Sequence, residues 1–278
     1  MAILSAFADE VTDDFSEQLS FLVSEDIQYI EIRFVNQKNI LELNRNELVE
    51  TKRMLDDSGI GVSAIGSPIG KVGINEPFMP HLEKFKHAVE LADFFDSYLI
   101  RIFSYYAPPG ASIDNYRAEV LKRMKQKAAL LEGTDIIMVH ENETGIYGSS
   151  AEKCVDMVKS VGSRNFKLAY DPANFVWGQK ISNNVEVCWP LMKKYVTHIH
   201  IKDWKLNSAD IGSLPGQGDA QIKKLLTELV TNRYAGFVTI EPHLKSGGQY
   251  GGETGPEFFK EAIVATRDLC KQVGLKCD

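Results

Sequence analysis

The sequence predicts a single (β/α)₈ TIM barrel of the α/β class, spanning residues 1–278. Short apolar runs alternate with longer amphipathic segments along the whole chain, which requires a parallel sheet because each parallel crossover needs a helix. Eight such runs fit within 278 residues, which matches the size of a closed barrel of eight strand–helix units. An open doubly wound sheet is the alternative, but no Gly-x-Gly-x-x-Gly turn follows the first run.

Each expected strand is a short run of apolar residues. The eight runs are Ile3–Ala8, Tyr29–Val35, Gly61–Ile65, Tyr98–Phe103, Ile136–Glu141, Phe166–Asp171, Val196–Lys202 and Phe237–Glu241. Between them, apolar residues recur at spacings of three and four, which predicts helices with one buried face. We expect Asp219 to cap one of these helices at its N-terminus. The expected helices are Phe15–Val23, His81–Phe95, Asn115–Leu131, Ala220–Leu229 and Pro256–Val273.

Composition and charge narrow the class of protein. The net charge of -7 disfavours nucleic acid as a partner, because an acidic protein repels a phosphate backbone. No apolar run approaches the roughly 18 residues of a membrane span. The N-terminal residues are interpreted as a first strand and not as a signal peptide, so we expect a cytoplasmic protein. None of the four cysteines forms a Cys-x-x-Cys pair, and Cys154 is expected to be a buried thiol. The sequence leaves a homo-oligomer open.

The parity of the strands predicts which side chains enter the barrel. In a strand, successive side chains point to opposite faces. In the run 196–202 the two isoleucines share one face, while His198, His200 and Lys202 share the other. If the apolar face packs under the helices, the charged face points into the barrel. The same argument sends Glu241 inward, and it gives Asp203 the opposite parity, so that Asp203 is expected to orient loop residues.

Ionisable residues occupy the C-terminal ends of the last four runs. Glu141, Asp171, His200 and Glu241 are separated by 30, 29 and 41 residues, each about one strand–helix unit. Neighbouring strands therefore deliver all four side chains to the mouth of the barrel where active sites form. Three carboxylates and an imidazole would repel one another there, and one divalent cation resolves this. Their chemistry suits Mn²⁺, Mg²⁺, Co²⁺ or Zn²⁺. His198 lies one layer deeper and is not expected to be a ligand.

Further charged residues near the strand ends are candidates for contacts with substrate oxygens or a phosphate. Glu31 shares an inward parity with Arg33, so an ion pair between them is the alternative for both. Glycine-rich loops at 214–219 and 245–253 follow the seventh and eighth runs, where barrels often bind phosphate. We interpret them as a mobile lid. Glu143 and His243, just beyond strand ends, suit either a substrate contact or a surface loop. The candidate substrate contacts are Arg33, Lys71, Arg101, His198 and Lys202.

Several blocks, in order, resemble the xylose-isomerase-like barrel superfamily, the sugar phosphate isomerases and epimerases. They are FADEVTDDFSEQLSFLVSEDIQYIEIR, IRIFSYY, HENETGIYG, YDPANF, HIHIKDW, PGQGDAQI and GFVTIEPH, and the likeness covers nearly the whole chain. In members such as ketose 3-epimerases, a Glu, an Asp, a His and a Glu from strands five to eight bind one metal. The matching residues here are Glu141, Asp171, His200 and Glu241.

The resemblance implies a metal-dependent isomerase or epimerase of a sugar, sugar phosphate or polyol ketone. Glu141 and Glu241 would transfer the proton next to a metal-bound carbonyl of this small carbohydrate substrate. A lyase resembling inosose dehydratase is the alternative. An abasic-site endonuclease of the same barrel is disfavoured, because those enzymes bind three metals with many more histidines than the six here. A non-catalytic sugar-binding module is disfavoured by the two glutamates.

Overall fold

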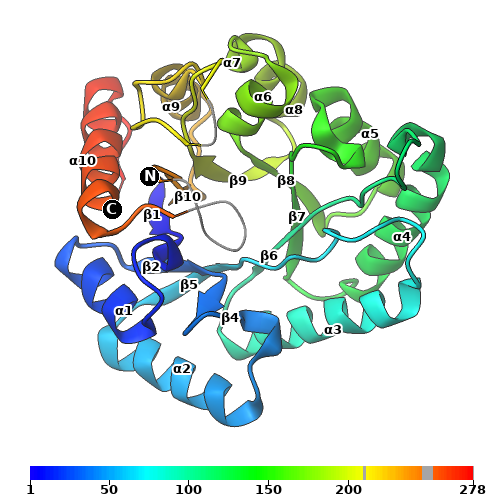
Figure 1. The fold of residues 1–278 in the computed structure, drawn as a ribbon, viewed down its shortest axis with the longest axis horizontal. Helices are drawn as coiled ribbons and strands as arrows, with labels where there is room; N and C mark the ends of the chain where they lie inside the picture. Colours follow the sequence, from blue (N-terminus) through cyan, green and yellow to red (C-terminus); the bar gives the residue numbers. More distant parts are fainter. Residues whose placement is uncertain (209–210, 246–252, 278) are drawn as a thin grey trace.

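A computed structural model describes residues 1–208, 211–245 and 253–277. Eight parallel strands close into a barrel in the order β1-β10-β9-β8-β7-β6-β5-β2, with the helices around it (Figure 1). The predicted fold class is therefore confirmed. The barrel strands are β1 Ile3–Ala6, β2 Tyr29–Ile32, β5 Gly61–Ile65, β6 Leu99–Ile102, β7 Ile137–Glu141, β8 Phe166–Tyr170, β9 Val196–Ile201 and β10 Phe237–Ile240.

The second expected strand is shorter than predicted. The run Tyr29–Val35 divides into β2 and a small antiparallel hairpin, in which β3 (Phe34–Val35) pairs with β4 (Lys38–Asn39). Asn36 and Gln37 form the turn with φ of 50° and 66°, the left-handed conformation that two-residue hairpin turns require. The hairpin brings Phe34 and Asn39 to the mouth of the barrel.

The five predicted helices correspond to α1, α3, α4, α9 and α10, within a few residues at each end. The helices α2, α5, α6, α7 and α8 have no counterpart among them. In α2 the buried side chains are few and include a threonine, so its periodic pattern is weak. Cys154 is fully buried in α5, as predicted. Within the described ranges, no helix combines the length and apolarity needed to cross a membrane. The helices are α1 Phe15–Ser24, α2 Arg45–Ser58, α3 Phe78–Phe94, α4 Arg117–Leu130, α5 Ala151–Val161, α6 Pro172–Gln179, α7 Asn184–Val187, α8 Trp189–Met192, α9 Ile222–Thr231 and α10 Pro256–Val273.

The predicted cap of α9 is wrong. Gln221, with φ of 58°, stands at the N-cap and makes no side-chain cap, while the Asp219 carboxylate accepts the Leu206 N–H at 2.8 Å. The preceding loop instead folds around Asp203, which organises it as its parity suggested. The Asp203 carboxylate accepts backbone N–H groups of Trp204, Gly216, Gly218 and Ala220 at 2.8–3.0 Å. Most of the second glycine-rich loop, residues 246–252, where a lid is expected, lies outside the described residues.

The barrel interior is built in layers. The lower layer is an apolar floor that consists of Ala64, Leu99, Val139, Ala169 and Phe237. Because side chains two residues apart share a face, the residues that follow this floor along each strand point into the barrel one layer higher. Val238 and Ile240 pack on the outside with the helical core, as predicted. The charged layer at the mouth therefore rests on an apolar floor that separates it from the opposite end of the barrel.

Candidate metal centre

The four predicted ligands come together at the mouth of the barrel. Glu141 is the last residue of β7, His200 lies near the end of β9, and Asp171 and Glu241 directly follow β8 and β10. One ligand atom from each lies within 4.8 Å of the others. All four side chains are buried. Their convergence reproduces the arrangement expected from strand parity and spacing.

The start of α6 positions two of these carboxylates. Asp171 is the N-cap of α6, and its Oδ1 accepts the Asn174 N–H at 3.1 Å. The Asn174 amide then donates to Glu141 Oε1 at 3.1 Å. The backbone N–H of Asp171 donates to Asn142 Oδ1 at 2.9 Å. One oxygen of each carboxylate is thereby fixed by the protein, which leaves the other oxygen for a further partner.

Glu31 orients the imidazole. Its buried Oε2 lies 3.2 Å from His200 Nε2 and 2.6 Å from His198 Nε2. Although burial opposes the charged carboxylate, His198 and then His200 lower the pKa of Glu31 well below its usual range. An ionised acceptor at Nε2 places the donor hydrogen there and leaves Nδ1 of His200, 3.4 Å from Glu141 Oε1, for a metal. His198 points to Glu31 and not into the ligand cluster.

The donor set fits a divalent ion. Glu141 Oε2, Asp171 Oδ2 and His200 Nδ1 are buried and have no hydrogen-bond partner of suitable geometry among the described residues. Such atoms are costly unless something compensates them. The ammonium of Lys202 supplies positive charge beside them, 2.6 Å from Asp171 Oδ2 and 3.3 Å from Glu241 Oε2. Carboxylate oxygens with one imidazole suit Mn²⁺, Mg²⁺, Co²⁺ or Zn²⁺.

Without a metal, burial and neighbouring charges strongly shift the pKa values within the cluster. Burial disfavours the charged form of His200, but Glu31 and Glu141 outweigh it and raise the pKa of His200 well above its usual value. Against the same burial, His200 and Arg101 lower the pKa of Glu141 to about 2. Burial raises the pKa of Asp171 to about 6, with Lys202 acting in the opposite direction. A bound cation would therefore displace the proton of His200.

Two neighbouring groups of possible ligands also occur, and each contains an ion pair within the protein. In the first, Glu31 accepts from both histidines. In the second, Glu10 joins Glu241 and His243. Glu10 Oε2 accepts hydrogen bonds from the Thr254 hydroxyl at 2.7 Å and from the backbone N–H of His243 at 2.9 Å. Arg33 lies 3.7 Å from Glu10 Oε1. Each of these groups offers three possible ligands, whereas Glu141, Asp171, His200 and Glu241 offer four, so this cluster is the better candidate.

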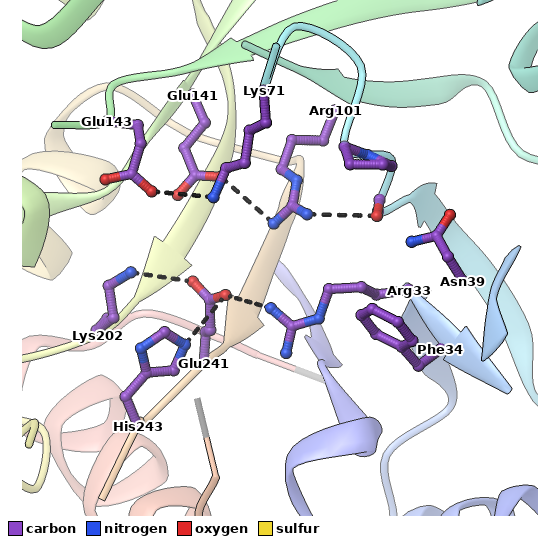
Figure 2. Close-up of a pocket in the computed structure, with 12 residues that line it drawn as sticks. Arg33, Phe34, Asn39, Lys71, Arg101, Glu141, Glu143, Lys202, Glu241 and His243 are labelled. Carbon is purple, nitrogen blue, oxygen red and sulfur yellow. Dashed lines mark hydrogen bonds and ion pairs between the residues drawn. The ribbon is translucent and has the colours of Figure 1, made fainter. Parts of the chain in front are cut away.

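A pocket opens directly above this cluster (Figure 2). Four of the five predicted substrate contacts line it, and the fifth, His198, lies below it. The ion pair of Arg33 with Glu31, which the sequence left open as an alternative, is not the arrangement found, since Arg33 Nε contacts Asp9 at 2.7 Å. Asp9 and Glu10 were missed, because the loop after the first strand shows no periodic signal. The lining residues are Arg33, Phe34, Asn39, Gly66, Pro68, Lys71, Arg101, Glu141, Glu143, Lys202, Glu241 and His243.

A family model described as xylose isomerase-like TIM barrel matches residues 19–263. The chain belongs to this family. The match takes in all four strands that carry the candidate ligands, so the whole candidate centre lies inside it. A search of curated proteins finds no match.

Several solved structures share the fold at low identity. D-psicose 3-epimerase from Clostridium cellulolyticum H10, with D-tagatose, is 15% identical with a TM-score of 0.74, covering 99% of this chain and 100% of that one. A probable 3-DHS dehydratase of Bacillus anthracis is 13% identical with a TM-score of 0.74, covering 96% and 99%. A barrel protein of Mycobacterium smegmatis in complex with magnesium is 13% identical with a TM-score of 0.77, covering 99% and 98%.

Replacing Glu31 by glutamine is expected to weaken metal binding about 10- to 100-fold, although Glu31 would not itself touch the metal. A neutral amide holds the Nε2 hydrogen of His200 less strongly and makes Nδ1 a poorer ligand. Calorimetric titration with Mn²⁺ measures the change, with Glu83→Gln on the exposed surface of α3 as the matched control. An unchanged affinity in Glu31→Gln would show that Glu31 does not orient His200.

Proposed function

We propose that this protein is a divalent-metal-dependent isomerase or epimerase of a sugar, sugar phosphate or polyol ketone. The observation that carries the proposal is the pair of buried glutamates, Glu141 and Glu241, which belong to one ligand cluster and line the same pocket. They come from β7 and β10, with β8 and β9 between them in the barrel. Two carboxylates on different sides of one substrate site are what proton removal and return on opposite faces require.

The residues of the chain would perform metal binding and proton transfer. Glu141, Asp171, His200 and Glu241 would hold the ion, which acts as a Lewis acid that polarises the substrate carbonyl. One glutamate would take the proton from the carbon beside that carbonyl, and the other would deliver a proton to the opposite face. Arg33 donates to Glu241 Oε1 at 2.9 Å and Asn174 donates to Glu141 Oε1, so both carboxylates are held in fixed orientations.

A lyase on a similar substrate is the second candidate, and His243 favours it. His243 Nε2 lies 3.4 Å from Glu241 and 3.1 Å from Glu10. Burial disfavours its charged form, but Glu10 outweighs this and raises the pKa of His243 to about 9. A protonated imidazole on the pocket wall suits the departure of a hydroxyl group as water. An endonuclease is disfavoured by the acidic net charge of -7.

Metal-loaded protein in D₂O separates these reactions. We expect solvent deuterium to enter a ketose at the carbon beside its carbonyl, with the epimer or isomer accumulating, when a panel of ketoses, ketose phosphates, keto sugar acids and inososes is followed by proton NMR. A new double bond in the product would identify the lyase instead. Stoichiometric metal without exchange or elimination in any member of the panel would contradict the proposed function.

A further inference from the structure

The charges around the pocket are unevenly matched. Four lysine and arginine side chains line it, namely Arg33, Lys71, Arg101 and Lys202. If Glu141, Asp171 and Glu241 are ligands, their negative charge is shared with the ion. Asp171 and Glu241 lie 2.6 and 3.3 Å from Lys202, so Lys202 stays beside two of the ligand carboxylates. Arg33 and Arg101 differ in whether they keep a carboxylate partner outside the cluster once the ion is bound.

Arg33 keeps two. Its Nε contacts Asp9 Oδ2 at 2.7 Å and its second terminal nitrogen lies 3.7 Å from Glu10 Oε1, in addition to its contact with Glu241. All three side chains are largely buried. Arg33 is therefore neutralised by the short helix after β1 and has little charge left for a ligand.

Arg101 keeps none. Its only carboxylate partner within the described ranges is Glu141, at 3.4 Å, and its remaining hydrogen bond goes to the Gly66 carbonyl at 3.3 Å. Its Nε is buried without a hydrogen-bond partner, and the residue is 5% exposed. A buried guanidinium that has lost its counter-charge is costly, and an anionic ligand removes the cost.

Lys71 lies beside Arg101. Lys71 Nζ is 4.3 Å from the centre of the Phe103 ring and Arg101 Cζ is 5.0 Å from the same centre. Figure 2 shows both side chains reaching into one side of the pocket. Gly70 makes this possible, since with φ of 98° it packs where a Cβ would lie 2.0 Å from the Phe103 carbonyl oxygen. Lys71 pairs with Glu143 at 3.2 Å, but both are partly exposed at the rim, where such a pair is weak.

We propose that the substrate of this site carries a carboxylate or phosphate group, which binds between Arg101 and Lys71. This rests on the proposed function, because Arg101 loses its partner only if Glu141 is a ligand. A guanidinium fork and an ammonium together match the several oxygens of either anion. The Phe103 ring contacts both cations. The substrate would therefore be a sugar acid or a sugar phosphate and not a neutral ketose.

Three ketohexoses that differ only at C6 test this directly. Mn²⁺-loaded protein is titrated with D-fructose, D-fructuronate and D-fructose 6-phosphate, which end in a hydroxyl, a carboxylate and a phosphate. We expect at least one charged ketose to bind roughly 10-fold or more tightly than fructose, as charge-assisted hydrogen bonds predict. The tighter of the two charged compounds identifies the anion. Equal binding of all three, or no binding of either charged ketose, would overturn the anion site.

Variants locate the preference and separate it from catalysis. Arg101→Gln and Lys71→Gln should each bring the charged ketose to within about threefold of fructose, and Arg101→Lys should restore part of the difference. Lys71 is partly exposed, so the Lys71 variant still tests the anion site even if a change at buried Arg101 harms folding. Lys86→Gln, partly exposed on α3, is the control. If both Gln variants keep the preference, the anion lies elsewhere. Deuterium exchange that proceeds equally on neutral and charged ketoses would uphold the proposed function while overturning this inference.

Discussion

Glu141→Gln and Glu241→Gln are each expected to lower the rate of net epimerisation by about 10²- to 10⁴-fold, the usual cost of removing a general base. Each glutamine keeps an oxygen that can reach the ion, so metal binding should survive in weakened form. Neither amide can accept and return a proton. Steady-state rates at saturating metal measure the loss, and Glu90→Gln on the exposed face of α3 is the control.

The two variants should differ in a way that a loss of rate alone does not show. In a two-base enzyme, the glutamate that remains reaches only one face of the substrate. Each variant should therefore exchange the substrate proton with D₂O from one epimer only, and the two variants should favour opposite epimers. A lyase would lack this mirror-image behaviour. Full activity in either variant would move the proton transfer to other residues, with Lys202 and His198 next.

Strand parity explains why so much of the centre could be predicted. Glu141, His200 and Glu241 continue the faces of strands whose other face is apolar, and the spacing of one strand–helix unit places them on adjacent strands. The eight strands and the inward charges follow from these two periodicities. Both are local patterns, which a single sequence displays.

The partners of these residues could not be predicted in the same way. Glu31 sits where the register of β2 against β5 shifts, and it meets histidines from β9 on the other side of the barrel. Arg33 finds Asp9 and Glu10 in a short helix after β1. Such pairings depend on how the closed barrel is staggered and where a bulge falls. The spacing of residues along the chain indicates neither the stagger of the barrel nor the position of the bulge.

The missed cap at α9 has a similar cause. Asp219 has the right residue type for an N-cap and directly precedes the helix predicted from Ala220, yet α9 begins only at Ile222 and the loop before it is folded around Asp203. Four backbone N–H groups converge on that one buried carboxylate, and burial raises the pKa of Asp203 against the lowering effect of these donors. A tertiary hydrogen-bond network therefore decides the local structure, and it overrides the local preference for capping.

Loss of two ligands should abolish metal binding and leave the fold intact. In Asp171→Asn with His200→Ala, one anionic oxygen and the single imidazole nitrogen disappear, so the remaining glutamates cannot hold the ion at micromolar concentration. Asparagine still caps α6, because it is as good an N-cap as aspartate. Residues at this face of a barrel serve function more than stability. Circular dichroism should therefore match that of the parent protein.

Thermal unfolding reads out the same change without any substrate. A ligand that binds only the folded state stabilises it by about 2.7 kcal/mol at one hundred times its dissociation constant. The parent protein should therefore melt at a higher temperature with Mn²⁺, Mg²⁺, Co²⁺ or Zn²⁺, while the double variant should show no shift. Asp93→Asn with His87→Ala on α3 makes the same chemical changes away from the mouth and should keep the shift. A metal-dependent shift that persists in the Asp171–His200 variant would place the ion at other residues, with Glu10, Glu241 and His243 the next group to test.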